Sequence, residues 1–517
     1  MDEQNELFDA HDVTGEQTPP KAAAEAAGGR PAAAVRVKPI DRRQLFFRSM
    51  DVDALVGPAH PVRAIWELVE RLDLSAFYQA IEAVEGEAGR PATDPKLLVS
   101  LWIYAYSRGV SSAREVARLC AYHPAYQWLT GAEAVSYHTL SSFRVQQKEA
   151  LDALFRDVLG VLSADGLIKM KRVTQDGTKV RACASSKSFR REERLAAHRK
   201  MAEEQIAAMG DPREEQVSQR TAQARARALR ERRARLERAA EELQKIREKK
   251  DSTEEKQQAR VSTTDPEARV MKQGDGGFGP SYNVQTTTDT EARVVLAVAV
   301  SQAGEDSGEL LPALERVEQN VGRKPEQVIA DGGYTNRKNI VAMEERGVEL
   351  IGSLERAAAR QRTQGVGEAF LSKMFVYDPA SNTFRCPAGE TLRAKGKKNQ
   401  PGATEYYYRA EAAACQVCAH HAACCPKTAA QGRLVVRVEE DPRVVAFRQK
   451  METAEAKAVY KQRAEVAEFP HAWLKEKIGL RRFRLRGLIK VGMEALWACL
   501  AYNIEQWIRL RPLAQAA

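Results

Sequence analysis

The chain has 517 residues, more than a single hydrophobic core usually holds, so two or three folded units with insertions are expected. Lysine and arginine number 80 against 70 aspartate and glutamate, and the isoelectric point near 9.1 favours a polyanionic partner over an acidic one. No apolar stretch is long enough to span a membrane and the first residues do not form a secretory signal, so we expect a cytoplasmic protein without a membrane partner.

Residues 1–40 have the composition of a disordered arm. They are polar at first and then rich in alanine, glycine and proline, which leaves too little apolar surface to repay the entropy of ordering them. Periodic apolar sequence, typical of helices, follows over residues 41–168. Asp94 and Pro95 have the residue types of an N-cap and a first helical turn, so a helix is expected to begin there.

Two further helices are predicted, one after Ser112 and one that runs from His138 toward Leu162. Short helices separated by polar turns resemble a helix-turn-helix layout, in which Thr139 and Arg144 approach DNA phosphates or bases. A helical bundle without any DNA contact fits the pattern equally well. We take the segment as a helical N-terminal DNA-binding domain.

Beyond residue 168 the pattern changes from helices to strands. Apolar runs that end at turn residues predict strands at 173–180, 282–287, 294–300, 327–330 and 347–352. Helical stretches lie between the later strands, at 308–320 and 336–346. This alternation predicts an α/β core, a mixed sheet flanked by helices, whose first part occupies residues 169–186 and 262–355.

The segment 187–261 is highly charged and interrupts the predicted sheet. Apart from a break at 210–212 it lacks strong helix breakers, so an inserted helical hairpin is expected. Leucines at 229, 236 and 243 recur every seven residues, which indicates a short coiled-coil contact. The stretch 220–238 carries eight arginines, which either hold DNA or form a solvated face, the more common meaning of such a run.

Two aspartates stand where predicted strands meet loops. Asp176 belongs to Val-Thr-Gln-Asp-Gly-Thr-Lys and Asp331 to Val-Ile-Ala-Asp-Gly-Gly-Tyr. An acid at the end of a buried strand projects into the crevice where open α/β sheets bind ligands, and the glycine after it lets a substrate approach. Each Asp-Gly pair alone is a common turn signal. Two such pairs on strands far apart in the sequence favour a shared site.

A third carboxylate is needed if two divalent cations are to clamp the attacking and leaving oxygens of an in-line displacement. Residues 441–512 are predicted to be helices that complete the core, and one of them offers Glu468. Lys475 follows on the same helix face, two turns later. Glu465 competes for the role of third acid, and Pro470 should distort the helix just beyond Glu468.

The strongest basic cluster of the sequence lies downstream of this helix. No acidic residue interrupts it, and it fits a surface that follows a DNA backbone and binds with strong salt dependence. Its members are Lys477, Arg481, Arg482, Arg484, Arg486 and Lys490. Aromatic residues follow at helical spacing and are assigned to the core, namely Trp497, Tyr502 and Trp507.

Five strings, in this order and at these distances, carry a family resemblance. They are Gly-Arg-Pro-Ala-Thr-Asp-Pro-Lys-Leu-Leu at 89–98, Asp-Gly-Thr-Lys at 176–179, Tyr-Asn-Val-Gln-Thr at 282–286, Ala-Asp-Gly-Gly-Tyr at 330–334 and Arg-Arg-Phe-Arg-Leu-Arg-Gly at 481–487. With them the chain resembles the DDE transposases of bacterial insertion sequences, specifically the branch with an RNase H-like core, a helical N-terminal domain and a Tyr-Arg-Glu-Lys helix. The resemblance runs from about Arg42 to Leu510.

The resemblance implies a two-metal active site. Two Mg²⁺ ions, for which Mn²⁺ can substitute, would activate water and then a 3′-hydroxyl against DNA phosphodiesters. Their implied ligands, which are also the catalytic residues, are Asp176, Asp331 and Glu468. Tyr460, Arg463 and Lys475 map onto contacts with the terminal phosphates or a displaced base. Four residues separate Arg463 from Glu468, where the family often has three.

The implied function is DNA cleavage and strand transfer at the ends of an insertion sequence. The partners would be double-stranded DNA, both terminal repeats and target, and a second copy of the chain when two ends are brought together. The expected location is the bacterial cytoplasm, at the nucleoid. The alternatives are an RNase H-like nuclease that hydrolyses DNA without joining it, and an inactive transposase-derived DNA-binding protein.

Residues 356–440 are predicted to be a cysteine-rich insertion with a zinc site. Tetrahedral zinc accepts four thiols in two groups with a CxxC pair, and similar transposases carry a comparable insertion. The predicted ligands are Cys386, Cys415, Cys418 and Cys424. Competing ligands are Cys425, His420 and His421. Reduced thiols without a metal are the alternative.

Overall fold

The computed structural model describes residues 49–83, 91–208, 219–354, 357–426 and 431–514. By its contacts, the chain from Asp51 onward forms one compact unit, the second of two. The predicted arm at 1–40 lies outside the described residues, and the described helices and strands all belong to the second unit. No helix in the described ranges has both the length and the apolar composition that a membrane-spanning segment requires.

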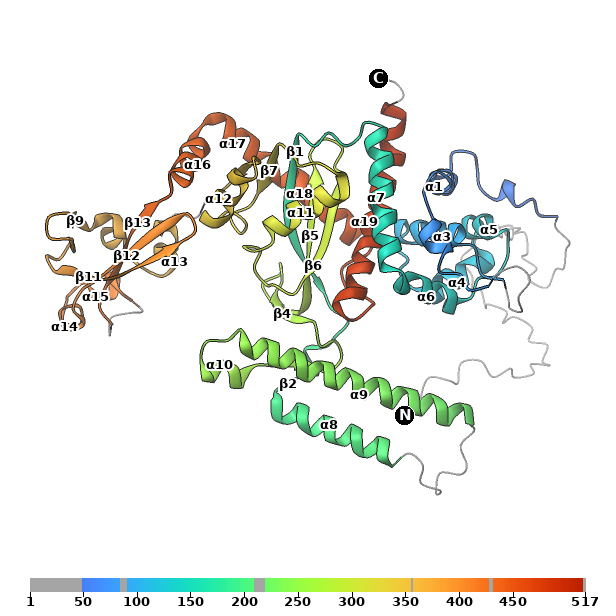
Figure 1. The fold of residues 1–517 in the computed structure, drawn as a ribbon, viewed down its shortest axis with the longest axis horizontal. Coiled ribbons are helices and arrows are strands. Elements are labelled where there is room, and N and C mark those ends of the chain that lie inside the picture. The colour runs from blue at the N-terminus through green and yellow to red at the C-terminus, as the bar shows by residue number, and fades with distance from the viewer. Residues whose placement is uncertain (1–48, 84–90, 209–218, 355–356, 427–430, 515–517) are drawn as a thin grey trace, which may run out of the picture. The chain divides into compact units, whose positions relative to one another are not determined.

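Helices fill the N-terminal part of this unit (Figure 1). After the 3-10 turn η1 (Asp53–Leu55) they are α1 (Pro61–Glu70), α2 (Ser75–Tyr78), α3 (Pro95–Ser107), α4 (Ala113–Tyr122), α5 (Pro124–Thr130), α6 (Tyr137–Gln146) and α7 (Lys148–Ala164). The predicted start of α3 is confirmed, because the Asp94 carboxylate accepts the backbone N–H of Lys96 at 2.8 Å. Ser112 caps α4 in the same way, through the N–H of Glu115.

The helix predicted from His138 toward Leu162 is in fact two helices, so that prediction is wrong. Gln147 has a non-helical conformation and separates α6 from α7. The break lets the two helices pack in different places. Both helices contact α19 (Leu488–Ala514), but α6 otherwise contacts α3 and α4, whereas α7 contacts α11 (Leu310–Val321).

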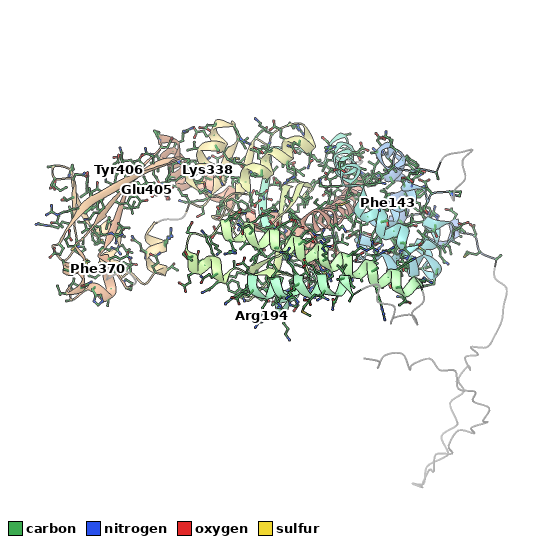
Figure 2. The ribbon with its side chains drawn as sticks, turned by 60° about the horizontal axis from the view of Figure 1, so that its bottom comes forward. Phe143, Arg194, Lys338, Phe370, Glu405 and Tyr406 are labelled. Atoms are coloured by element: carbon green, nitrogen blue, oxygen red, sulfur yellow. The ribbon has the colours of Figure 1, made fainter. Side chains whose placement is uncertain are left out.

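Aromatic side chains make up much of the core around these helices. Trp102 and Tyr106 of α3 are fully buried, and the ring of Phe143, labelled in Figure 2, stacks on Phe77 with centroids 5.2 Å apart. α19 runs through the same core and contacts α3, α7 and the sheet. The prediction of core aromatics on α19 is confirmed by the burial of Trp497, Tyr502 and Trp507.

A six-stranded sheet forms the centre of the α/β part (Figure 1). Its strands are β1 (Arg172–Arg181), β4 (Arg269–Lys272), β5 (Phe278–Asp289), β6 (Val295–Ser301), β7 (Gln327–Ala330) and β8 (Glu349–Gly352). β1 pairs antiparallel with β5, whose other edge pairs antiparallel with β4 at one end and with β6 at the other. On its second edge β1 pairs parallel with β7, which pairs parallel with β8. The five predicted strands are confirmed, and β4 is an additional strand.

Helices flank this sheet, as the alternating pattern predicts. α11 and α12 (Arg337–Glu345) connect the later strands. α11 packs against β5 and β6, and α19 packs against β6. Asn503 of α19 fixes this contact, because its side chain accepts the N–H of Val295 and donates to the Val295 carbonyl, both at 2.8 Å. After α16 (Pro442–Glu452) and α17 (Ala454–Lys461), α18 (Arg463–Glu476) contacts β1 and β5.

Two long helices, α8 (Glu192–Ala207) and α9 (Gln219–Glu248), form the predicted helical insertion, and α10 (Thr253–Gln258) follows them. The predicted break at 210–212 lies outside the described residues. Leu236 and Leu243 of the seven-residue spacing lie in a contact between the helices that also buries Leu195, Ala202 and Ala239, whereas Leu229 is half-buried and lies outside it. The insertion is not wholly helical, because β2 (Phe189–Arg190) and β3 (Val261–Ser262) pair antiparallel at its two ends.

The cysteine-containing segment forms a second sheet, which the sequence pattern did not predict. Its antiparallel strands pair in the order β13-β12-β11-β10-β9. They are β9 (Val376–Asp378), β10 (Thr383–Arg385), β11 (Thr391–Gln400), β12 (Ala403–Arg409) and β13 (Leu434–Glu440). Around them lie α13 (Ala357–Thr363), η4 (Glu368–Phe370), η5 (Ser372–Met374), α14 (Ala412–Gln416) and α15 (His421–Cys424). Phe384 and Tyr408, with ring centroids 4.9 Å apart, lie in its small core.

Candidate active site

Asp176 and Asp331 come together on neighbouring strands of the six-stranded sheet. β1 and β7 run parallel, and their register pairs Gln175 with Ala330. Asp176 follows the first of these residues and Asp331 follows the second, so the two aspartates take the next position in the same register. Asp176 lies within β1, whereas Asp331 is the first residue after β7 ends.

The carboxylate of Asp176 is largely buried. Its side chain is 17% exposed, and its Oδ1 accepts the backbone N–H of Gly177 at 2.9 Å. Burial raises the pKa of Asp176 to about 6, against the opposing effects of the Gly177 N–H and the Arg463 charge, and the negative charges of Asp331 and Asp306 raise it further. A carboxyl group held beside other acids with so little counter-charge is typical of a place that binds cations.

His471 of α18 faces the same carboxylate. Its ring is buried, and its Nε2 lies 3.8 Å from Oδ2 of Asp176 and 3.4 Å from the hydroxyl oxygen of Thr286. Burial and the nearby Lys475 ammonium lower the pKa of His471 to about 4, so the ring is neutral at pH 7 and does not form a salt bridge. Its Nδ1 is buried and has no hydrogen-bond partner in the described part of the chain.

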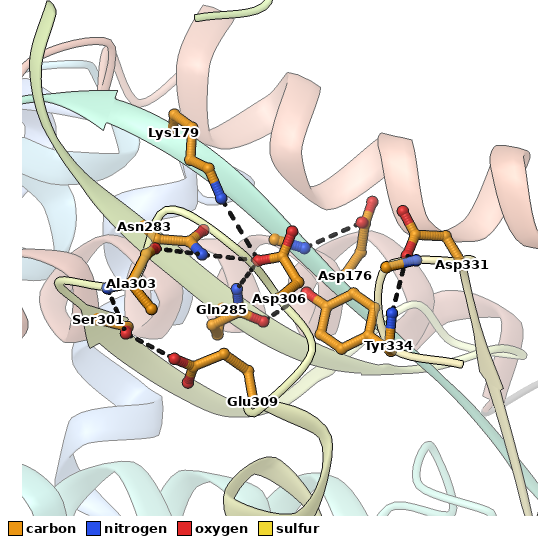
Figure 3. Close-up of polar contacts among 12 residues, drawn as sticks. Asp176, Lys179, Asn283, Gln285, Ser301, Ala303, Asp306, Glu309, Asp331 and Tyr334 are labelled. Atoms are coloured by element: carbon orange, nitrogen blue, oxygen red, sulfur yellow. Dashed lines mark hydrogen bonds and ion pairs between the residues drawn. The ribbon is translucent and has the colours of Figure 1, made fainter. Parts of the chain in front are cut away.

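Asp306 is a third carboxylate at this site, from the loop between β6 and α11 (Figure 3). Its Oδ1 accepts hydrogen bonds from the side-chain amides of Asn283 at 2.6 Å and Gln285 at 2.7 Å. The same oxygen lies 3.4 Å from Nζ of Lys179. In Figure 3, Asp306 lies between Lys179 and the two aspartates Asp176 and Asp331.

A network of buried amides and hydroxyls supports this arrangement. Tyr334 donates its hydroxyl hydrogen to Oε1 of Gln285, which also accepts from Nε2 of Gln175 at 2.8 Å. The hydroxyl of Thr287 donates in turn to Oε1 of Gln175 at 2.6 Å. Because each amide has both of its ends engaged, the network fixes the orientation in which Gln285 presents its N–H group to Asp306.

The helix that carries Glu468 packs against β1. Lys475 of this helix donates to the hydroxyl of Thr178, and burial lowers the pKa of Lys475. Glu468 is exposed and, among the described residues, has no hydrogen-bond or ion-pair partner. Glu465, its competitor, is 75% exposed and forms an ion pair with Arg293. Glu465 is thus an ordinary surface glutamate in an ion pair, whereas the carboxylate of Glu468 has no partner among the described residues.

Tyr460 and Arg463 lie on different helices, so the prediction of one helix through both is wrong. α17 ends before Arg463, which is the first residue of α18. Tyr460 is half-buried against Ile329 and Ile351, and the Arg463 guanidinium lies 6.0 Å from the centroid of its ring. Arg463 is also close enough to Asp176 to stabilise the charged form of that carboxylate.

The three predicted acids do not form a closed metal-binding group. In the ranges that the structure describes, no three His, Cys, Asp or Glu side chains are grouped closely enough to hold a metal ion. The sheet brings the two aspartates together, whereas Glu468 comes from α18. The predicted distortion at Pro470 does not end this helix, which continues to Glu476.

Two family models match the chain. The model described as "Transposase domain (DUF772)" matches residues 50–146, which are N-terminal helices, and the model described as "Transposase DDE domain" matches residues 385–508, which include Glu468. Both models describe transposases, and the two matches together indicate an insertion-sequence DDE transposase. No curated protein matches the transposase at a significant level.

Among solved structures, the transposase is similar to one described as "Cryo-EM structure of piggyBac transposase synaptic complex with hairpin DNA". The sequence identity is 9%, and the match covers 88% of this chain and 82% of that chain with a TM-score of 0.24.

The basic cluster of the transposase lies along the edge of β1. Arg482 forms a parallel bridge with Arg181, and Phe483 is buried with its ring edge toward Tyr282. Arg484 donates to the hydroxyl of Ser111 at 2.7 Å. The predicted DNA contacts that are exposed are Arg481, Arg482, Arg484, Arg486 and Lys490. They stay candidates for phosphate contacts.

Arg144, in contrast, is a core residue of the transposase. Its side chain is 5% exposed, its guanidinium lies 4.8 Å from the ring centroid of Trp102, and it donates to the carbonyl of Ser111. The predicted DNA contact of Arg144 is therefore wrong, because α6 turns this side chain inward. Thr139, on the same helix, is half-exposed and stays a candidate.

The candidate zinc ligands lie around one cavity beside the second sheet. Its lining includes Cys386, Cys415, Cys418, Cys424, Cys425, His420 and His421. Two sulfurs accept backbone N–H groups, Cys386 from Glu390 at 3.2 Å and Cys415 from Arg433 at 3.3 Å. Burial raises the pKa of Cys424 to about 12. No three of these side chains close around a point, so zinc binding stays a prediction.

Asp306 and His471 are the site residues that sequence reasoning missed. Asp306 lies in Gly-Glu-Asp-Ser-Gly, a string with the composition of an ordinary turn. His471 lies one turn after Glu468 and one turn before Lys475. Helical spacing from Lys475 was therefore a usable signal for His471, whereas the string around Asp306 offered none.

Proposed function

We propose that the transposase cleaves DNA at the ends of its element and joins those ends to target DNA, with Asp176, Asp331 and Glu468 as catalytic acids. The observation that carries the proposal is the register of β1 and β7, which sets Asp176 beside Asp331. The strand order supports it further. Antiparallel strands β6, β5 and β1, followed by parallel β7 and β8, have the arrangement of an RNase H-like core.

The donors at this site suit Mg²⁺ or Mn²⁺. Carboxylate oxygens are the ligands that these ions prefer. No lysine or arginine of the described residues forms an ion pair with Asp176 or Asp331. The amide oxygen of Asn283, beside Asp306, is buried without a hydrogen-bond partner. A divalent cation would offset this unbalanced negative charge, and the proposal requires Glu468 to approach the aspartates when metal and DNA bind.

Each side chain then has a defined task. Bound divalent ions would supply Lewis-acid activation of water or a 3′-hydroxyl and would offset charge on the phosphate. Lys475, held on Thr178, and Arg463, beside Asp176, present positive charge to phosphate oxygens. His471 fills the space next to Oδ2 of Asp176 and keeps water away from it.

The partners follow from the same proposal. Double-stranded DNA would lie along the exposed arginines after α18, with Tyr460 near the displaced end. Bringing two element ends together calls for a second copy of the chain, so we propose a homodimer on DNA. The site of action is the nucleoid in the bacterial cytoplasm.

The proposal is tested by incubating the full chain with Mg²⁺, DNA that carries the ends of its element, and a target plasmid. Wild type is expected to give cleaved and joined products, and Asp331→Asn is expected to give neither. Cleavage without joining would indicate the nuclease alternative. If wild type binds the ends but does not cut them, the catalytic assignment fails and the chain is a DNA-binding protein.

The third acid has a matched control on the same helix. Glu468→Gln is expected to abolish cleavage, whereas Glu465→Gln removes only the ion pair with Arg293 and should leave cleavage intact. The reverse result would move the third ligand to Glu465.

A further inference from the structure

An aromatic ring is exposed at the start of β5. Phe278 is 71% exposed, and glycines on both sides give it no neighbouring side chains to pack against. The turn before it is well held, since Gln273 donates its N–H to the Gly277 carbonyl at 2.7 Å and its side chain donates to Ser281 at 2.8 Å. A single exposed apolar residue is common on protein surfaces, so the meaning of Phe278 depends on the groups around it.

Phe278 borders a groove of about 660 Å³. We call it the Phe278 groove, and its lining includes Arg181, Ser185, Gln273, Phe278, Arg482 and Arg486. The arginines come from two segments, the end of β1 and the stretch after α18. Arg181 also forms an ion pair with Asp275 on the turn, at 3.3 Å, which ties the turn to β1.

Positive charge in the Phe278 groove is poorly balanced. Arg482 and Arg486 have no carboxylate partner within 4 Å among the described residues, and Arg486 donates only to the Cys183 carbonyl at 3.2 Å. The Arg486 charge also acts on Arg235 of α9, whose pKa is lowered first by burial and then by that charge. Its Nε is buried without a hydrogen-bond partner. Three guanidinium groups, those of Arg181, Arg482 and Arg486, thus line the groove together with one aspartate, Asp275.

The two carboxylates behind this groove each accept a backbone N–H through one oxygen. Asp265 accepts the N–H of Gly487 at 3.1 Å, and Glu267 accepts the N–H of Leu488 at 2.9 Å. They hold the backbone that carries Arg486 and do not pair with its guanidinium. The unpaired arginine charge therefore indicates an anionic partner. A protein surface that is apolar or poor in acidic residues would leave this charge without a counter-charge.

The groove lies on the same strand as the candidate active site. Arg181 is five residues after Asp176, which at about 3.3 Å per residue is roughly 16 Å along β1. Duplex DNA rises about 3.4 Å per base pair, so this length corresponds to about five base pairs. DNA held at the aspartates can thus reach the groove.

We propose that the Phe278 groove binds DNA beside the site of cleavage, with its arginines on the phosphates and Phe278 stacked on a base that has left the duplex. This inference rests on the proposed function for its position, and goes beyond it by naming a stacking residue. An aromatic face needs an unpaired base, because paired bases hide their faces within the stack. Arginine matches the phosphate geometry and tolerates any sequence.

Affinity measurements in EDTA test this inference independently of catalysis. The probes are a blunt fluorescent duplex and the same duplex with a short single-stranded fork. Wild type is expected to prefer the fork. Phe278→Ala should bind the fork about 5- to 150-fold more weakly, the worth of one stacked base, with little change for the blunt duplex. Phe278→Tyr should restore the preference, since tyrosine keeps the ring.

Two controls make the result specific. Val376→Ala removes an equally exposed apolar side chain, 69% exposed on β9, and should bind both probes like wild type. Arg482→Ala should weaken the binding of both probes to the same extent. It should also reduce the salt dependence of that binding by about the share of one phosphate contact.

Unchanged fork binding by Phe278→Ala would overturn the inference and leave the proposed function standing. A changed oligomeric state with unchanged fork binding would overturn it in favour of a second copy of the chain at this face. Wild type that binds neither probe, nor DNA with the element ends, would instead remove the proposed function itself.

Discussion

The Nε2 atom of His471 lies 3.8 Å from the Oδ2 atom of Asp176, and both side chains are largely buried. The distance is too long for a hydrogen bond, and the low pKa of His471 leaves the ring uncharged at pH 7. The ring therefore does not neutralise Asp176. It excludes water from a carboxylate whose pKa is raised to about 6, mainly by burial.

This relationship predicts a pH dependence of metal binding. A carboxyl group with its pKa raised to about 6 is protonated below that pH and cannot act as a ligand. Mn²⁺ affinity of the wild type, measured by water proton relaxation, should fall about tenfold for each pH unit below about 6. His471→Ala admits water to Asp176 and should move the pH at which Mn²⁺ affinity begins to fall toward the ordinary aspartate pKa.

A matched histidine substitution on α8, His198→Ala, should leave that pH unchanged. If His471→Ala also leaves it unchanged, His471 does not shield Asp176 from water.

Asp306→Asn is expected to weaken Mg²⁺ binding. The substitution keeps the size of the side chain but removes one negative charge beside Asp176 and places an amide among the donors of Asn283 and Gln285. Changes to groups that support metal ligands typically cost 10- to 100-fold in affinity, and a loss of about that size is expected in a Mn²⁺ titration. Glu309→Gln is the control, because Glu309 follows in the same segment and pairs with Ser301 instead. Equal affinities for the two variants would remove Asp306 from the site.

Gly177 is predicted to tolerate no larger side chain. A Cβ at this position would lie 2.8 Å from the Tyr334 hydroxyl oxygen and 3.0 Å from Oδ1 of Asp306, atoms that the amide network holds in place. Gly177→Ala should lower the free energy of unfolding by about 1–3 kcal/mol, the usual cost of overpacking. Gly304→Ala, where a Cβ meets nothing within 4 Å, should not. The free energy of unfolding of both variants is measured by denaturant titration. Equal values would show that the amide network shifts to make room for the added methyl group.

The parts of the fold that the sequence predicts are those with an apolar pattern. The strands β5, β6 and β7 are buried runs, and their bounds were predicted to within a few residues. The second sheet was not predicted because nearly all residues of β11 are exposed, and its lysine-rich sequence is typical of a loop. Arg144 was misplaced for a related reason, since a helical arginine ordinarily points to solvent and this one is held over Trp102.

The site residues also divide into those that lie beside recognisable apolar strands and those that only the folded structure brings together. The Asp-Gly pairs beside recognisable strands located both acids, although only Asp331 follows its strand as predicted, whereas Asp176 lies within β1. Asp306 depends on a loop that only the folded sheet brings to the acids, through Asn283 and Gln285 of β5. Helical spacing placed Lys475 on the helix of Glu468, but which side of α18 meets β1 was fixed by packing.

The cysteine cavity gives the last prediction, that the purified transposase holds one zinc ion there. The sulfurs of Cys386 and Cys415 already accept backbone N–H groups, which hold both side chains in place on the cavity wall. Metal analysis of the wild type should find zinc, and Cys415→Ser should lose it. The fourth ligand is decided by comparing Cys418→Ser with Cys425→Ser, because both side chains line the cavity and Cys425 is the more buried. Cys120→Ser, a buried thiol of α4, controls for thiol loss and should keep the metal. Wild-type protein without zinc, and with every thiol open to alkylation once unfolded, would establish the metal-free alternative.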